Sequence, residues 1–305
     1  MKRFLWALPA AWLLAAAPAL WAAEPLSVCM SADSPPQSSA KPKGTVTGFD
    51  VRLAEAMATA MGRELKLIPF DSEYEKESTL AHEVNALLSS GVCDLVSGFP
   101  LMQADFGPPS RATARTPDYP GAKRKRERPF IPLGSLMASR AYQASTLVVV
   151  LRPDAPPVNA LLDLRGRKMG AVPGTLGGTL VNLYSNGALR AGMVSLTQRE
   201  DAWMALESGR VDALIVPSAT YDAYRLEKPQ TPLTLGAYRR PVGINLGFVA
   251  LATQSALLAT VNQVIERALA DGSVQRWASV EGLSWQHPTS PDIAAGLSLQ
   301  GLVAD

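Results

Sequence analysis

The residues best suited to bind a small charged group lie at 161–179, LLDLRGRKMGAVPGTLGGT. The spacing predicts a strand at 168–172, a turn at 173–175 and a helix from about Leu180. A glycine-rich loop that opens a helix directs backbone N–H groups at one point, which favours a carboxylate or another electron-rich group. The loop matches neither G-x-G-x-x-G nor G-x-x-x-x-G-K-[ST], so it does not indicate nucleotide binding. An ordinary strand-to-helix turn is the simpler interpretation of the loop alone.

Two cysteines, Cys29 and Cys93, form the second group of residues with reactive side chains. Each follows a valine in a predicted strand, and two cysteines in an exported protein most simply form one disulfide. Two buried free thiols are the alternative. The two histidines, His82 and His287, have no spacing that suits a cluster of metal ligands. We therefore expect a disulfide, and we expect neither a metal nor a cofactor.

Residues 1–23 have the pattern of a secretory signal peptide. Lys2 and Arg3 precede an apolar run at 5–17, and small residues near Ala19 or Ala23 fit a cleavage site. The run is short for a bilayer span, so a membrane anchor is the weaker interpretation. Without its two basic residues the chain keeps 27 of 29 basic residues against 27 acidic ones, which gives no general affinity for nucleic acid. We expect an exported, soluble protein of the periplasm.

The rest of the chain alternates predicted strands and helices. The first series has strands at 26–30, 64–70 and 93–99, with helices at 49–61 and 78–90. This βαβαβ order predicts a parallel sheet with right-handed crossovers. The second series has strands at 147–151, 168–172, 193–196, 211–216 and 246–251, with helices at 199–208, 219–227 and 256–270. Residues 229–241 are predicted to be irregular, and the last fifteen or so residues to be loosely attached.

Residues 103–138 interrupt this alternation. Prolines and glycines are frequent there, and KRKRER at 123–128 is a run of charges. A loop of this length is usually functional or mobile. A solvated surface insertion is one interpretation, and a basic docking surface for an acidic partner is the other.

Seven short motifs follow one another in an order that points to a known family. They are GFDV at 48–51, CDLVSG at 93–98, SRAY at 139–142, DLRGRK at 163–168, PGT at 173–175, ALESGRVDA at 205–213 and the segment 262–277. Their order and spacing resemble the family 3 periplasmic solute-binding proteins, which feed polar amino acid ABC transporters. Each motif is weak alone, but the match covers nearly all of the chain after the leader except 103–138.

The resemblance implies a type II periplasmic-binding-protein fold, with two α/β lobes, two hinge crossovers and a ligand cleft between the lobes. Lobe one would comprise 24–143 and 244–305, and lobe two would comprise 144–243. The cleft would be lined by Asp33, Gly98, Tyr142, Gly174, Thr175 and Ser218. The implied partners are a small-molecule solute and a membrane ABC permease, and we expect a monomer.

Two positions depart from the family pattern. Amino acid binders of this family usually carry an arginine about ten residues before the tyrosine of SRAY. Its guanidinium group donates two hydrogen bonds to the α-carboxylate of the ligand. This chain has Pro132 there. They also usually place an aspartate after the strand corresponding to 211–216, to hold the α-ammonium group, and this chain continues with Pro217 and Ser218. These departures argue against an ordinary α-amino acid as the ligand.

Two arginines are candidates to replace the missing one. Arg128 or Arg140 would have to reach the cleft, which requires the insertion to fold inward. We expect an amino-acid-like solute that is small and polar or anionic. If the solute is an anion, the loop at Gly174 and Thr175 would be its main holder, through backbone and hydroxyl donors.

Val28-Cys29 and GVCD at 91–94 also resemble a branch of this family that is associated with periplasmic quinoprotein (PQQ) alcohol dehydrogenases. That branch implies an accessory partner of the dehydrogenase, with a vestigial cleft. A third alternative is an enzyme on the same fold, with Asp33, Tyr142 and Asp212 as acid–base groups. No pairing of a nucleophile with a base can be identified, so we do not expect an enzyme.

Overall fold

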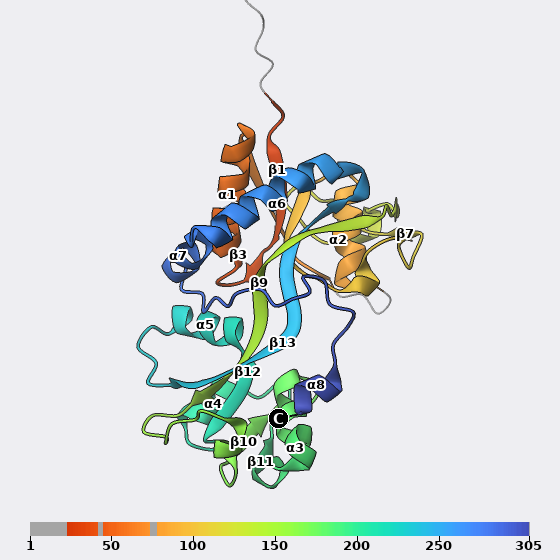
Figure 1. Cartoon of the computed structure of the whole chain (residues 1–305). Coiled ribbons are helices and arrows are strands. Elements are labelled where there is room, and N and C mark those ends of the chain that lie inside the picture. The colour runs from red at the N-terminus through yellow and green to blue at the C-terminus, as the bar shows by residue number, and fades with distance from the viewer. Residues whose placement is uncertain (1–22, 42–44, 74–77, 305) are drawn as a thin grey trace, which may run out of the picture.

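The computed structural model describes residues 23–41, 45–73 and 78–304 (Figure 1). The predicted leader lies outside the described residues, except for its last position. Two lobes share one eight-stranded sheet, with the strand order β11-β10-β12-β9-β13-β6-β1-β5. The structure thus has the predicted two-lobe α/β architecture. Across the described ranges, no helix combines the length and apolar character needed to cross a membrane.

Lobe one, the upper half in Figure 1, contains the predicted βαβαβ unit. Its elements are β1 (Leu26–Ser31), α1 (Phe49–Met61), β5 (Leu65–Phe70), α2 (Leu80–Ser89) and β6 (Leu95–Pro100). β1 pairs in parallel with both β5 and β6, which confirms the predicted parallel sheet. A small antiparallel sheet of β2 (Asp33–Ser34), β3 (Ser38–Ala40) and β4 (Val46–Thr47) follows β1.

Lobe two, the lower half, contains the second αβ unit. Its strands are β10 (Met169–Ala171), β11 (Met193–Ser195) and β12 (Ala213–Pro217). Its α-helices are α3 (Leu176–Gly187), α4 (Ala202–Glu207) and α5 (Ser218–Glu227), and its 3₁₀ turns are η3 (Leu161–Leu164) and η4 (Arg190–Gly192). β10 runs parallel to β11 and β12, whereas β12 is antiparallel to the long strand β9.

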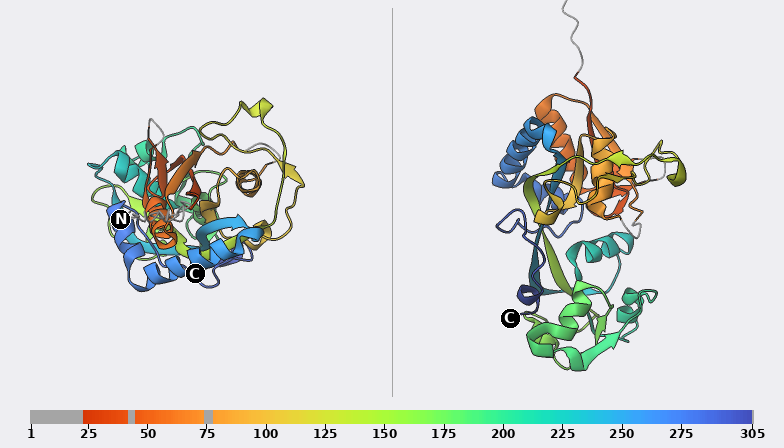
Figure 2. Two further views of the ribbon diagram at one scale, coloured as in Figure 1. Left: turned by 90° about the horizontal axis from the view of Figure 1, so that it is seen from above. Right: turned by 90° about the vertical axis from the view of Figure 1, so that its right-hand side faces the viewer.

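Two long antiparallel strands connect the lobes. They are β9 (Leu136–Leu151) and β13 (Thr234–Leu251), and they cross the waist between the lobes (Figure 2). The prediction of irregular chain at 229–241 was wrong from Thr234 onward. Pro241 hid this strand in the sequence, because proline is compatible with a strand chiefly at an edge or an irregularity. The pairing of β13 with β9 indeed shifts register between Pro241 and Asn245.

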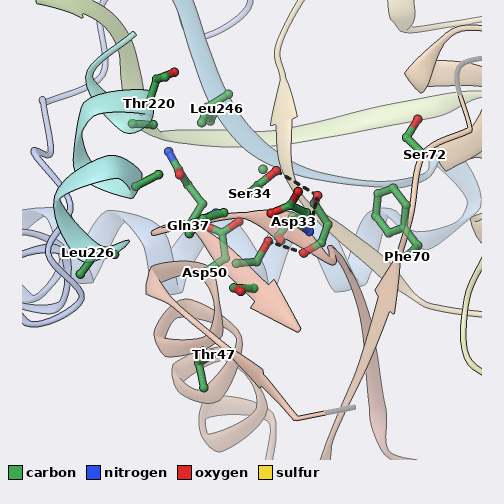
Figure 3. Close-up of a pocket in the computed structure, with 18 of the residues that line it drawn as sticks. Asp33, Ser34, Gln37, Thr47, Asp50, Phe70, Ser72, Thr220, Leu226 and Leu246 are labelled. Atoms are coloured by element: carbon green, nitrogen blue, oxygen red, sulfur yellow. Dashed lines mark hydrogen bonds between the residues drawn. The ribbon is translucent and has the colours of Figure 1, made fainter. Parts of the chain in front are cut away.

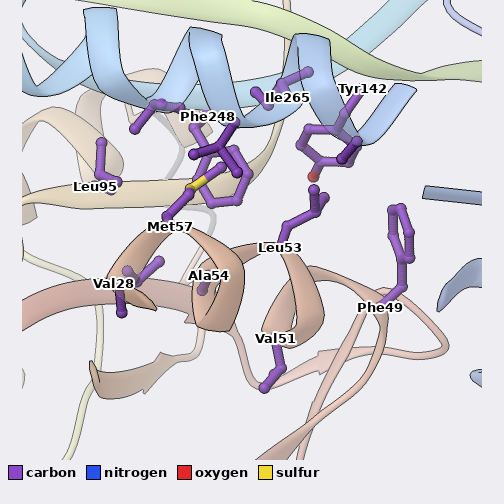
Figure 4. Packing of buried hydrophobic residues seen from close by; sticks show 14 of the residues in the cluster. Val28, Phe49, Val51, Leu53, Ala54, Met57, Leu95, Tyr142, Phe248 and Ile265 are labelled. Carbon is purple, nitrogen blue, oxygen red and sulfur yellow. The ribbon is translucent and has the colours of Figure 1, made fainter. Parts of the chain in front are cut away.

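The core of lobe one lies on both faces of its half of the sheet. On one face α1 packs against α6 (Ser255–Ala270) and β1, with Met57, Phe248 and Ile265 in contact inside the cluster (Figure 4). On the other face α2 covers the predicted disulfide, which is present between Cys29 and Cys93. Buried side chains thus pack on both faces of the lobe-one half of the sheet.

The insertion forms an arm at the side of lobe one. It contains η1 (Gln103–Asp105), β7 (Thr113–Ala114), η2 (Lys125–Glu127) and β8 (Ile131–Pro132). β7 and β8 pair with each other, and the arm projects beside α2 (Figure 1). Lys125 and Arg128 hold the arm to Glu73 through ion pairs of 2.8 and 2.5 Å.

The C-terminal tail returns to lobe two. After β13 come η5 (Ala252–Gln254), α6, α7 (Ser273–Val280) and finally α8 (Leu299–Val303). Leu302 is buried in the core cluster that contains α3, and Arg240 donates hydrogen bonds of 2.7 Å to Gly301 O and Ala304 O. The prediction of a loosely attached tail was therefore wrong. The residues that anchor the tail are distant in sequence, so its composition carried no sign of them.

Candidate functional site

A cavity of about 1140 Å³ lies between the lobes. Its lobe-one wall comes mainly from β1 to β4 and the carboxyl ends of β5 and β6, and its lobe-two wall comes from the start of α4 and from the whole length of α5. The carboxyl ends of parallel strands are the usual place for a ligand in an α/β fold. Figure 3 shows these side chains around the cavity. The residues that the following paragraphs use are Asp33, Gln37, Lys41, Asp50, Phe70, Ser97, Gly98, Asp201, Trp203, Tyr224, Glu227 and Lys228.

A buried hydrogen-bonded chain lies behind the lobe-one wall. The Tyr142 hydroxyl donates to Asp50 Oδ1 at 2.9 Å and accepts from the Gly98 N–H, also at 2.9 Å. Gly98 has φ +67°, and a Cβ there would stand 3.2 Å from Asp50 Oδ2. Both the backbone conformation and the space at this position therefore favour glycine. The chain of bonds fixes where Asp50 presents its carboxyl group.

Asp50 is a carboxyl group poised to change charge. Burial raises the pKa of Asp50 to about 7, and hydrogen bonding by the Ser97 and Tyr142 hydroxyls offsets part of that rise. Burial together with the neighbouring Asp50 also raises the pKa of Tyr142, so the tyrosine remains a donor. At neutral pH the Asp50 population is therefore divided between ionised and neutral forms.

Two further polar side chains of the same wall have little solvent exposure. Gln37 is only 8% exposed, and within the described part of the chain its side-chain amide makes no hydrogen bond. Figure 3 shows this amide pointing across the cavity toward Thr220 of α5. Ser97 is 7% exposed, and its hydroxyl lies near the Asp50 carboxyl but, among the described residues, has no partner at standard hydrogen-bond geometry. A polar group at a cavity wall without a protein partner is available to a ligand, and Gln37 is the clearer case of the two.

The lobe-two wall is aromatic. The Trp203 and Tyr224 rings stack with their centroids 4.3 Å apart and their planes 17° apart. The Tyr224 hydroxyl donates to Glu207, which fixes the ring from behind. Phe70 lines the cavity from lobe one. Because Tyr224 also has Lys228 Nζ 5.0 Å from its ring centroid, Trp203 and Phe70 are the aromatic side chains of the lining that remain for a solute.

The charged groups of the lining are mostly acidic. Four carboxylates, Asp33, Asp50, Asp201 and Glu227, stand against two ammonium groups, Lys41 and Lys228. None of the described lining residues is an arginine. The acidic groups differ in their engagement, because Asp201 caps α4 by accepting from two backbone N–H groups, whereas the exposed Asp33 carboxylate has no partner among the described residues.

The predicted site residues divide into two groups. Asp33 and Gly98 line the cavity, and Tyr142 lies directly behind Gly98. Gly174, Thr175 and Ser218 are not among the lining residues.

The loop at 173–178 is occupied by its own structure. The Thr175 hydroxyl donates to Val172 O at 2.8 Å and accepts from the Gly178 N–H at 3.0 Å, so it caps α3. The helix begins at Leu176 rather than near Leu180. Gly177 allows this early start, because a Cβ there would come 1.9 Å from Ile215 O.

Neither candidate arginine reaches the cavity. Arg128 is buried but donates to Glu73 at 2.5 Å and to Thr116 O at 2.6 Å. Arg140 is exposed and pairs with Glu266 at 2.5 Å. In the described lining, therefore, neither Arg128 nor Arg140 takes the place of the arginine that amino acid binders usually carry at the position of Pro132.

Three informative lining residues carry no signal of a binding site in the sequence: Gln37, Asp50 and Trp203. Asp50 was visible only as part of the GFDV motif, and Gln37 lies in a serine-rich loop that gave no periodic signal. Trp203 lies in a helix with apolar neighbours, a pattern typical of a core residue.

Residues 26–92 match the family model described as bacterial extracellular solute-binding proteins, family 3. The resemblance to family 3 is confirmed. The matched segment includes most of the lobe-one wall, from Asp33 to Phe70. No curated protein sequence matches the chain.

Solved structures of family 3 solute-binding proteins share the fold over most of the chain. Substrate-binding domain 2 of Lactococcus lactis GlnP, in an open conformation, has a TM-score of 0.62 at 17% identity and covers 86% of this chain and 96% of its own. The unliganded, open L-cystine solute receptor of Neisseria gonorrhoeae has a TM-score of 0.57 at 17% identity, with the same coverage. Likeness at this identity concerns the fold, and it confirms the two-lobe type II architecture.

Proposed function

We propose that this protein is a periplasmic solute-binding protein of an ABC importer. It takes a small polar solute into the cleft and presents it to a membrane permease. The observation that carries the proposal is Gln37, whose side-chain amide has no hydrogen-bond partner among the described residues, on the wall of a cavity large enough for a metabolite. The amino-acid-binding relatives of the same fold support it.

The proposed cycle uses the two long strands as a hinge. The solute first contacts the fixed polar groups of the lobe-one wall, and rotation of lobe two then brings Trp203 and Tyr224 over it. Closure would satisfy Gln37 and exclude water from the solute. A solute that stabilises the closed form raises the unfolding temperature by mass action.

Thermal unfolding with a panel of neutral, cationic and anionic polar metabolites tests this function. We expect at least one solute to raise Tm and to reduce the radius of gyration in small-angle X-ray scattering. Gln37→Ala should weaken both effects, whereas Gln103→Ala, the same change at an exposed position outside the cleft, should leave them intact. If no solute of any charge shifts Tm, the proposal fails.

The arm supports a second candidate, an accessory protein of a quinoprotein alcohol dehydrogenase. Lys123, Arg124 and Arg126 are exposed on a segment that Lys125 and Arg128 anchor to Glu73, so the arm presents positive charge from a fixed position.

Charge reversal on the arm tests the second candidate. Changing Lys123, Arg124 and Arg126 to glutamate should abolish salt-sensitive binding to such an enzyme. A matched triple reversal on lobe two, at Arg165, Lys168 and Arg199, should preserve it. Equal binding by both variants would contradict a docking role for the arm.

A further inference from the structure

The charges around the cleft point to the class of solute, provided that the cleft is the solute site proposed above. We propose that the solute is an organic cation that carries no carboxylate group. The inference rests on three features of the lining: the absence of a carboxylate receptor, the carboxylate groups of lobe one and the aromatic wall of lobe two.

A carboxylate finds no suitable partner in the described lining. An arginine would offer two parallel N–H donors to it, and the two candidate arginines, Arg128 and Arg140, are committed to Glu73 and Glu266. Of the two lysines, Lys228 lies 3.9 Å from Glu207 and 5.0 Å from the Tyr224 ring centroid. Lys41 is exposed at the rim. A solute carboxylate would therefore enter a cleft whose lining already has more negative than positive groups.

A cation finds partners on the same wall. The Asp33 carboxylate is exposed and has no partner in the part of the chain that the structure describes, and the Asp50 carboxyl lines the same wall. Figure 3 shows Asp33, Gln37 and Asp50 gathered on one side of the cavity. The Gln37 amide oxygen is a third acceptor, since no described residue donates a hydrogen bond to it.

The aromatic wall suits the remainder of such a molecule. Trp203 lines the cleft from lobe two and Phe70 lines it from lobe one, whereas the Tyr224 ring is already in contact with Trp203 and Lys228. Ring faces attract ammonium and guanidinium groups and also pack against alkyl chains. Leu226 and Ala219 extend this apolar surface along α5. An alkyl ammonium or alkyl guanidinium ion thus matches both walls.

Matched pairs of solutes that differ by one carboxylate provide the test. Isothermal titration calorimetry at pH 7.5 would compare 1,5-diaminopentane with lysine, 1-amino-4-guanidinobutane with arginine, and ethanolamine with serine. We expect the member without a carboxylate to bind with a Kd about tenfold lower or more in at least one pair, a difference of about 1.4 kcal/mol. Asp33→Asn should raise that Kd by about tenfold, whereas Glu64→Gln, at the opposite end of β5 from the cleft, should leave it unchanged.

The outcomes separate this inference from the proposed function. Tighter or equal binding of the amino acid in every pair, or a shift in Tm caused by an anionic metabolite alone, would overturn the cationic, carboxylate-free solute while preserving solute binding. An unchanged Kd in Asp33→Asn would overturn the placement of the cation at the lobe-one wall. No detectable binding by any solute of the calorimetric panel, with no shift in Tm across the wider one, would overturn both.

Discussion

The two walls of the cleft are built in different ways. On lobe one, polar groups are buried and held by a hydrogen-bonded chain through Tyr142, above a framework that a disulfide cross-links. On lobe two, the wall is a pair of stacked rings on short helices, with Trp203 only half-buried. Recognition by directional hydrogen bonds needs fixed groups, whereas closure over a solute needs area and tolerance. Under the proposed function, lobe one would recognise the solute through hydrogen bonds, and lobe two would close over it.

The lobes also differ in how the chain ends are used. Lobe one is completed by α6 and α7, which pack on α1. Lobe two receives only the last helix, α8, after the tail has crossed the waist, where Asn245 forms five hydrogen bonds with Thr289, Pro291 and Asp292. The tail is therefore a third connection between the lobes, and it contributes stability to lobe two.

The largest expected effect concerns the charge of Asp50. Its pKa rises from 3.8 in the unfolded chain to about 7 in the folded protein, so between these values the folded state holds a proton that the unfolded state has lost. Its contribution to stability is therefore complete below pH 4, falls as pH rises and levels off above pH 7, with a total of up to about 4 kcal/mol. The Asp50→Asn side chain cannot ionise, so the stability of this variant should not show the decrease between pH 4 and pH 7 that Asp50 causes.

Urea unfolding of the wild type and of Asp50→Asn at pH 4.5, 5.5, 6.5 and 7.5 measures the difference. We expect the variant to gain stability relative to the wild type at each step toward pH 7.5. Parallel pH profiles for the two proteins would mean that the carboxyl group at the lobe-one wall is solvated rather than buried.

The second prediction compares the same substitution on the two lobes. Gly98 and Gly174 both have positive φ, +67° and +82°, but a Cβ at Gly98 meets Asp50 whereas one at Gly174 meets nothing within 4 Å. Gly174→Ala should cost only the backbone strain, about 1 kcal/mol. Gly98→Ala should cost about 3 kcal/mol, since the added methyl also displaces the Asp50 carboxyl.

Thermal unfolding ranks the two variants, and solute titration separates their effects. Gly98→Ala should lose most of the solute-induced shift in Tm, and Gly174→Ala should keep it. Equal loss of solute response in both variants would contradict the assignment of recognition to lobe one.

The third prediction concerns the tail. Leu302 is 3% exposed among the residues that pack on α3. Leu302→Ala should destabilise lobe two by about 2 kcal/mol, the lower end of the range for a buried leucine, because a short terminal helix can relax. Hydrogen exchange should become faster in α3 and stay unchanged in α1. Faster exchange in both helices would show that the lobes unfold as one unit.

The sequence predicted the repeated αβ units well, because each helix has an apolar face and each strand ends at a glycine, proline or polar turn. It predicted the disulfide from cysteine count and context alone. It failed where contacts join distant segments. The strand at 234–241 depends on pairing with β9, and the anchoring of Leu302 depends on a pocket beside α3. The lining residue Gln37 was invisible for the same reason, since its significance lies in burial rather than in its neighbours along the chain.

The smallest expected effect concerns Thr175, to which the sequence assigned a solute contact. In the structure its hydroxyl is committed to both Val172 O and the Gly178 N–H, as the cap of α3. Thr175→Ala should therefore lower stability by about 1 kcal/mol. Thr175→Ser, which keeps the hydroxyl, should restore most of that stability. Because the capping hydroxyl lies outside the described lining, the Kd for the solute should stay the same in both variants. A rise in Kd with Thr175→Ala that Thr175→Ser reverses would instead show that the Thr175 hydroxyl takes part in binding the solute. That result would contradict the assignment of solute recognition to lobe one alone.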